Sequence, residues 1–153
     1  MTKSGNVKSR SVDLVSIDPG ATSGVAEFVE GVLVANEAIK HDKLQDYLKK
    51  VSAKEVVVEY PVWYPEGRSK SSSPNDLIRL SFRAGLAASV VVFNGASLIE
   101  VKPAEWKGQI PDDILYRRID KKLSEEELKI RKSNHNARDA VGIGLWRLKR
   151  FLI

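Results

Sequence analysis

The chain has 153 residues, of which 42% are hydrophobic and 29% charged, a composition typical of a globular protein long enough to bury a core. It contains no cysteine, which excludes disulfides and thiolate zinc sites and favours a reducing, intracellular setting. The formal net charge of +5 suits a polyanionic partner, and no apolar run reaches the roughly 18 residues of a membrane span, so we expect no membrane attachment.

The first half of the chain predicts four strands and one helix. Residues 1–10 are basic and aperiodic and predict a flexible arm, which leaves residues 11–153 as one domain. Strands are predicted over 11–18, 24–29 and 32–34, and an amphipathic helix over 42–50 leads to a buried strand over 55–59. The two tight turns predict an antiparallel meander, whereas the helical connection favours a parallel pairing of the first and fourth strands.

The second half predicts a long loop, one strand and several helices. Residues 61–74 are rich in proline and serine and predict an exposed loop, after which Asn75 or Asp76 caps a helix that reaches about residue 92. A strand over 97–101 and helices over 112–123 and 134–151 follow, with Ser124 capping a short turn between them. This order predicts an α/β fold with a mixed five-stranded sheet, three antiparallel strands and then parallel ones, flanked by helices.

Three acidic residues stand beside apolar segments. Asp18 ends the first strand, Glu59 ends the fourth, and Asp139 lies within the C-terminal helix. If the first and fourth strands are neighbours, Asp18 and Glu59 emerge together, and a helix that crosses the same edge can add Asp139. Clustered carboxylates repel one another unless a cation lies among them, and their hard oxygens suit magnesium or manganese. The alternative interpretation gives each acid a surface salt bridge.

Several motifs, in this order, resemble those of RuvC-like Holliday-junction resolvases, particularly the phage-encoded branch. The motifs are Ser16-Ile17-Asp18-Pro19-Gly20 with Thr22-Ser23-Gly24, Val56-Val57-Val58-Glu59, Val101-Lys102-Pro103-Ala104-Glu105-Trp106-Lys107-Gly108, and His135-Asn136-Ala137-Arg138-Asp139-Ala140. The resemblance covers nearly all of residues 12–150.

The resemblance implies a ribonuclease H-like fold, a homodimer and hydrolysis of phosphodiester bonds in a four-way DNA junction with two divalent cations. Asp18 would bridge both ions, Glu59 would hold one and Asp139 the other. Magnesium is the expected metal, and manganese is a possible substitute. The expected location is the cytoplasm of a bacterial or phage-infected cell.

The sequence departs from the family pattern at the fourth position of the site. Members commonly carry Asp or His three residues before the last Asp, where this chain has Asn136, with His135 one residue earlier. Both positions lie on the helix face of Asp139, so either side chain could serve as a ligand. We favour His135 as ligand or base, because an amide supplies only a weak carbonyl ligand and no base. A polar residue at a helix start is the alternative role for His135.

Aromatic and basic residues near Glu59 are candidate DNA contacts. The aromatics could stack on unpaired bases or simply pack on the neighbouring prolines, and each basic residue could instead be plain surface charge. These candidates are Tyr60, Trp63, Tyr64, Arg68, Lys70, Arg79, Arg83 and Lys107. The apolar helix over 77–92 carries more apolar surface than one sheet face can cover, which favours a homodimer.

The sequence thus predicts a metal-dependent DNA endonuclease that resolves four-way junctions. Two alternatives remain open. One is another nuclease of the same fold that acts on flaps or RNA–DNA hybrids, and the other is an inactive module that binds branched DNA.

Overall fold

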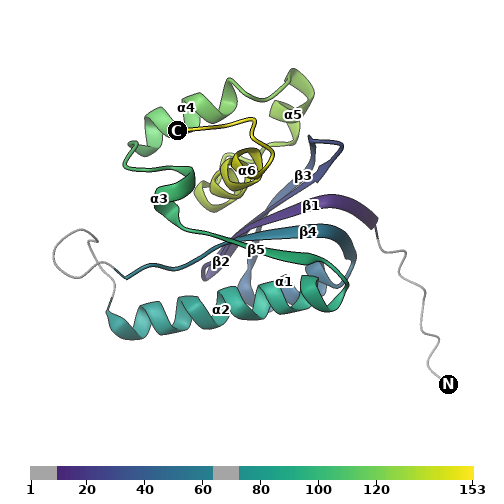
Figure 1. Cartoon of the computed structure of the whole chain (residues 1–153), viewed down its shortest axis with the longest axis vertical. Coiled ribbons are helices and arrows are strands. Elements are labelled where there is room, and N and C mark those ends of the chain that lie inside the picture. The colour runs from purple at the N-terminus through teal and green to yellow at the C-terminus, as the bar shows by residue number, and fades with distance from the viewer. Residues whose placement is uncertain (1–9, 64–72) are drawn as a thin grey trace.

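The computed structural model describes residues 10–63 and 73–153. In this part of the chain, helices cover both faces of one sheet (Figure 1). Strands β1 (Arg10–Asp18), β2 (Thr22–Val29) and β3 (Val32–Lys40) form an antiparallel meander. Strand β4 (Val51–Glu59) runs parallel to β1, and β5 (Ser97–Val101) runs parallel to β4, which gives the order β3-β2-β1-β4-β5. The predicted mixed sheet and its parallel pairing of the first and fourth strands are confirmed.

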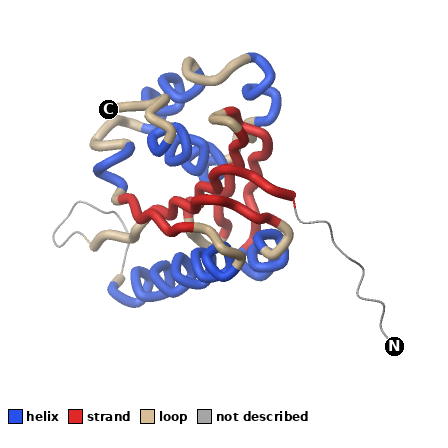
Figure 2. The backbone as a smooth tube through the Cα atoms, turned by 45° about the vertical axis from the view of Figure 1, so that its right-hand side comes forward, coloured by secondary structure: helices blue, strands red, loops and turns tan. Residues whose placement is uncertain are grey.

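Two layers of helices enclose the sheet, as the turned view in Figure 2 also shows. Helices α1 (His41–Leu48) and α2 (Pro74–Phe93) lie on one face. Helix α6 (His135–Arg147) lies on the other, with the shorter helices α3 (Pro103–Trp106), α4 (Asp112–Asp120) and α5 (Glu125–Ile130) around it. None of the helices in the described part of the chain combines the length and apolar character that a membrane span requires.

Each face of the sheet has its own hydrophobic core because successive strand residues point to opposite sides. Val57 packs with Phe28 and Trp106 on the α6 side, whereas the preceding residue, Val56, packs with Leu44 on the α1 and α2 side. Every one of these side chains is almost fully buried. The long apolar runs of β1 and β4 therefore serve two cores, and their ends are held rigidly between two layers.

Several predicted boundaries were wrong for local reasons. Strand β3 continues to Lys40 rather than residue 34, because an edge strand tolerates the polar residues that hid its alternation. Helix α2 is capped by Ser73 rather than by Asn75 or Asp76: the Ser73 hydroxyl accepts from the Asp76 amide, and the Asp76 carboxylate accepts from the Ser73 amide.

The predicted N-terminal arm, residues 1–10, was one residue too long. Arg10 belongs to β1, and its guanidinium is hydrogen-bonded to the buried carboxylate of Glu27.

The last helix ends at Arg147, because Lys149 adopts a positive φ of 57° that turns the chain back. Helix α3 was not predicted, since four residues are too few to show a helical period.

Candidate active site

Two carboxylates meet at the ends of neighbouring parallel strands. Asp18 is the last residue of β1 and Glu59 the last of β4, and the register that pairs Ile17 with Val58 places them side by side. Asp18 is only 8% exposed although no hydrogen bond neutralises its charge in the described residues. A buried carboxylate without compensation is costly, and such positions are candidates for functional sites.

Helix α6 carries the third carboxylate, Asp139, to the same end of the sheet because the helix packs very close to β1 and β2. A Cβ on Gly24 would lie 1.8 Å from the backbone oxygen of Asn136, so only glycine allows this approach. The Ser16 hydroxyl donates to the Ala140 carbonyl at 2.6 Å and holds the next turn of the helix to β1. Asp139 lies in the turn between these two contacts and is 2% exposed.

The three carboxylates act on one another electrostatically. Burial raises the pKa of Asp18 well above its ordinary value, and the nearby charges of Glu59 and Asp139 raise it further. Burial likewise raises the pKa of Glu59, although Lys107 opposes that shift. The three carboxylates therefore lie near enough to act on one another's charge, and their joint role as a site stays a prediction.

Lys107 and Trp106, at the end of α3, supply the compensating contacts. The Lys107 Nζ donates to Asp139 Oδ2 at 3.1 Å and lies 3.8 Å from Glu59 Oε2. Burial alone would lower the pKa of Lys107, but the two carboxylates outweigh it and raise the pKa. The indole Nε1 of Trp106, a fully buried residue, donates to Glu59 Oε2 at 2.6 Å. Lys107, predicted as a DNA contact, thus lies inside the carboxylate cluster.

The donor set fits a divalent cation chemically. Its three members offer carboxylate oxygens alone, which magnesium and manganese prefer. As they stand, no three His, Asp or Glu side chains in the described residues are grouped closely enough to hold a metal ion. The Lys107 ammonium contacts two of the carboxylates instead, so a single positive charge balances part of the charge that a metal would balance.

The structure brings His135 rather than Asn136 into contact with the cluster. The Nε2 atom of His135 lies 3.7 Å from Asp139 Oδ2, and its Nδ1 contacts the hydroxyl of Tyr116. The side chain of Asn136 makes no hydrogen bond in the described residues, and its backbone faces Gly24. This placement supports the choice of His135 as the fourth member, which stays a prediction.

Tyr116 and Trp106 are site residues that were not among the predicted candidates, although Trp106 lies in one of the motifs that carry the resemblance. Tyr116, on α4, donates its hydroxyl to Asp139 Oδ1 at 2.7 Å. Both residues occupy core positions of their segments, so their spacing indicates only packing. The one signal is chemical, since a buried Tyr or Trp needs a partner for its polar hydrogen.

The candidate DNA contacts other than Lys107 divide into three groups. Arg79 and Arg83 of α2 line a cleft of about 510 Å³ whose wall also includes Glu59, which connects them with the carboxylates. Tyr60 and Trp63 follow Glu59 and are about half exposed. Tyr64, Arg68 and Lys70 lie outside the described residues.

Comparison with known proteins places this geometry in a known fold. No family model matches the chain, and neither does any curated protein. Among solved structures, Thermus thermophilus RuvC in complex with a Holliday junction substrate is 18% identical, with a TM-score of 0.63 over 92% of this chain and 98% of that one. A second Thermus thermophilus RuvC structure is 17% identical, with a TM-score of 0.55 over 91% of this chain and 98% of that one.

A viral protein gives a similar result. The Fowlpox virus resolvase, solved with its substrate Holliday junction DNA, is 16% identical, with a TM-score of 0.51 over 89% of this chain and 98% of that one. At these identities the likeness establishes the fold. The chain therefore has the ribonuclease H-like fold of RuvC, which confirms the predicted fold class.

Proposed function

We propose that this chain is a metal-dependent DNA endonuclease that resolves four-way junctions. The observation that carries the proposal is the meeting of Asp18, Glu59 and Asp139 at one buried site. Support comes from the fold, because RuvC and the Fowlpox virus resolvase share it and were both solved with Holliday junction DNA. A site so rich in negative charge has no evident structural use.

The three carboxylates would hold two magnesium ions, for which manganese could substitute. When bound, such a pair supplies an activated water and stabilises the leaving oxygen of a phosphodiester. Trp106 keeps the Glu59 carboxylate in place through its indole donor. Lys107 would no longer be needed as counter-charge, and its ammonium would turn to a DNA phosphate. His135 would accept the proton of the attacking water at Nε2.

The DNA would approach along the cleft that joins Glu59 to α2. Arg79 and Arg83 stand one helical turn apart on its wall. Two guanidinium groups at that spacing suit successive phosphates. Tyr60 and Trp63, at the start of the loop after Glu59, would stack on bases left unpaired at the junction.

We further propose that two copies of the chain associate through α2. An exposed stripe of this helix repeats at alternating steps of four and three residues, the spacing of a helix–helix seam. The stripe consists of Ile78, Phe82, Gly85, Ser89 and Val92. A Cβ on Gly85 would meet nothing within 4 Å, so no contact among the described residues requires a glycine that costs the helix about 1 kcal/mol.

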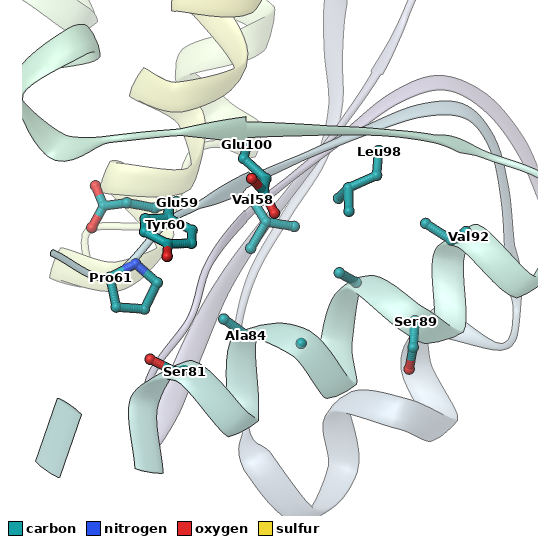
Figure 3. A pocket seen from close by; sticks show the side chains of 12 residues that line it. Val58, Glu59, Tyr60, Pro61, Ser81, Ala84, Ser89, Val92, Leu98 and Glu100 are labelled. Carbon is teal, nitrogen blue, oxygen red and sulfur yellow. The ribbon is translucent and has the colours of Figure 1, made fainter. Parts of the chain in front are cut away.

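The groove beside this stripe extends the apolar surface. It has a volume of about 370 Å³ and lies between α2 and the edge strand β5, where Leu98 faces Val92 (Figure 3). Close approach of a second α2 at Gly85 would cover both the stripe and the groove. We expect wild-type protein to sediment as a dimer at micromolar concentration, and Phe82→Glu, whose parent side chain is 69% exposed, to sediment as a monomer. A monomeric wild type, with and without junction DNA, would contradict this proposal.

The catalytic proposal is tested by separating cleavage from binding. Asp18→Asn, Glu59→Gln and Asp139→Asn should each abolish magnesium-dependent cleavage of a labelled four-way junction yet bind it at least as well as wild type, since less negative charge repels phosphate less. Asp13→Asn is the matched control, because Asp13 is also on β1 but pairs with Lys54 outside the site. Wild-type cleavage by any one of the three site variants would remove that residue from the site.

A further inference from the structure

Tyr116 contacts two members of the candidate site through a single hydroxyl. The phenol donates to Asp139 Oδ1 at 2.7 Å, and the same oxygen contacts His135 Nδ1. The two rings meet edge to face, with centroids 5.8 Å apart. Tyr116 itself is 9% exposed, so water does not compete freely for these bonds.

The acceptor of this hydroxyl proton determines which ring nitrogen of His135 carries a hydrogen. A phenol has one proton to give, and the bond to a carboxylate is the stronger of the two because the acceptor is charged. A phenol with an ordinary pKa of about 10 keeps its proton at neutral pH, and the 2.7 Å contact with Asp139 Oδ1 directs that proton to the carboxylate. His135 Nδ1 must then donate to the phenol oxygen, and in the neutral imidazole the free lone pair is on Nε2.

The two oxygens of the Asp139 carboxylate also have different partners. Its Oδ1 is engaged by Tyr116, whereas Oδ2 faces Lys107 Nζ at 3.1 Å and His135 Nε2 at 3.7 Å. Tyr116 therefore leaves Oδ2 available, and Oδ2 is the oxygen of Asp139 that faces Lys107 and His135. The same hydroxyl thus orients the carboxylate and the imidazole toward one point.

Tyr116 is itself held by charged groups outside the cluster. The guanidinium of Arg138 lies over its ring at 4.2 Å from the centroid and donates to Asp120 at 3.0 Å. Arg131 forms a second ion pair with Asp120, at 3.1 Å. The guanidinium, held by Asp120, packs over the face of the Tyr116 ring, so the ring and its hydroxyl have little freedom to turn away from the site.

We propose that Tyr116 is a positioning residue, which aims Asp139 Oδ2 at the metal and sets the neutral tautomer of His135 with its lone pair on Nε2. This inference rests on the proposed function, since it assigns a role toward the same metal. Removing a group that orients a metal ligand typically weakens metal binding about 10–100-fold. Tyr116→Phe should do so here, because it removes only the hydroxyl and leaves the ring and its packing.

The matched control is Tyr47→Phe. Tyr47 also donates its hydroxyl to a buried carboxylate, Glu27 Oε1 at 2.6 Å, but it belongs to α1 on the other face of the sheet. Both variants lose one buried hydrogen bond to a carboxylate, so both should lose similar stability. Only Tyr116→Phe should change the candidate site.

Two measurements on the full chain test the inference. Manganese titrated into DNA-free protein by calorimetry should bind wild type and Tyr47→Phe alike, and Tyr116→Phe about 10–100-fold more weakly. Nitrogen NMR of the two histidines at alkaline pH should show His135 protonated at Nδ1 in wild type and released from that tautomer in Tyr116→Phe.

The outcomes separate the inference from the proposed function. Equal manganese affinity in Tyr116→Phe and wild type, or an unchanged His135 tautomer, would overturn the positioning role and leave the proposed function standing. Absence of manganese binding in wild type and both variants would overturn the metal site, and the inference with it. Equal weakening in both Tyr variants would also overturn it, because a general loss of stability would then explain the effect.

Discussion

Replacing Lys107 with methionine would remove the ammonium that lies between two buried carboxylates. Its Nζ is 3.1 Å from Asp139 and 3.8 Å from Glu59, separations at which each attraction is about 4–5 kcal/mol at an effective dielectric constant of 20. Desolvation offsets most of this sum, and breaking a buried pair costs a net of about 3–5 kcal/mol. Since the Lys107 side chain is 25% exposed, we expect the lower end, about 3 kcal/mol.

The assay is thermal unfolding with and without a divalent cation. In EDTA, Lys107→Met should lower the melting temperature by about 6–12 °C, from the usual scaling for chains of this size. Millimolar magnesium should restore much of that loss, because a cation bound to the carboxylates stabilises the folded state by mass action. Lys54→Met, which removes an exposed partner of Asp13, is the control and should shift the melting temperature little. An unchanged melting temperature of Lys107→Met in EDTA, or a loss that magnesium does not reduce, would refute this reasoning.

Three further outcomes are expected. The pKa of Asp18 in the folded protein is raised above its ordinary value of 3.8, so the stability that its protonated form contributes is lost as the pH rises through the raised pKa. The free energy of unfolding, measured in EDTA, should therefore fall over this pH range, and Asp18→Asn should flatten the fall. Gly24→Ala should lose more than about 3 kcal/mol in urea unfolding, since its Cβ would lie 1.8 Å from a backbone oxygen of α6. In junction cleavage, His135→Ala should cost at least about tenfold more rate than Asn136→Ala; the reverse ranking would make the amide the ligand.

The sheet order and its acidic ends were predictable because they depend on local rules. Tight turns force antiparallel neighbours, and a helical connection allows a parallel pair, so Asp18 and Glu59 had to emerge together once β1 and β4 paired. The extent of β3 was not predictable in this way. It lies at the sheet edge, where the alternation of apolar and polar residues is weak.

The contacts that tune the site were beyond the sequence because they join segments far apart in the chain. Trp106 reaches Glu59 across 47 positions, and Tyr116 reaches Asp139 across 23. Lys107 follows Trp106 directly, and its placement against the carboxylates depends on how the short α3 docks beside α6. Helical or strand periodicity indicates which residues are buried, but not which distant polar group a buried side chain meets.

The most direct test of the central claim is cleavage of a labelled four-way junction beside linear duplex, flap and RNA–DNA hybrid substrates, each with magnesium, manganese or EDTA. We predict that the wild-type protein cuts the four-way junction with either metal, cuts the other substrates poorly, and cuts nothing in EDTA. Equal or faster cleavage of the flap or hybrid would assign a different nuclease activity to the same site. Binding of the junction with no cleavage in either metal would contradict the claim and identify a module that only binds branched DNA.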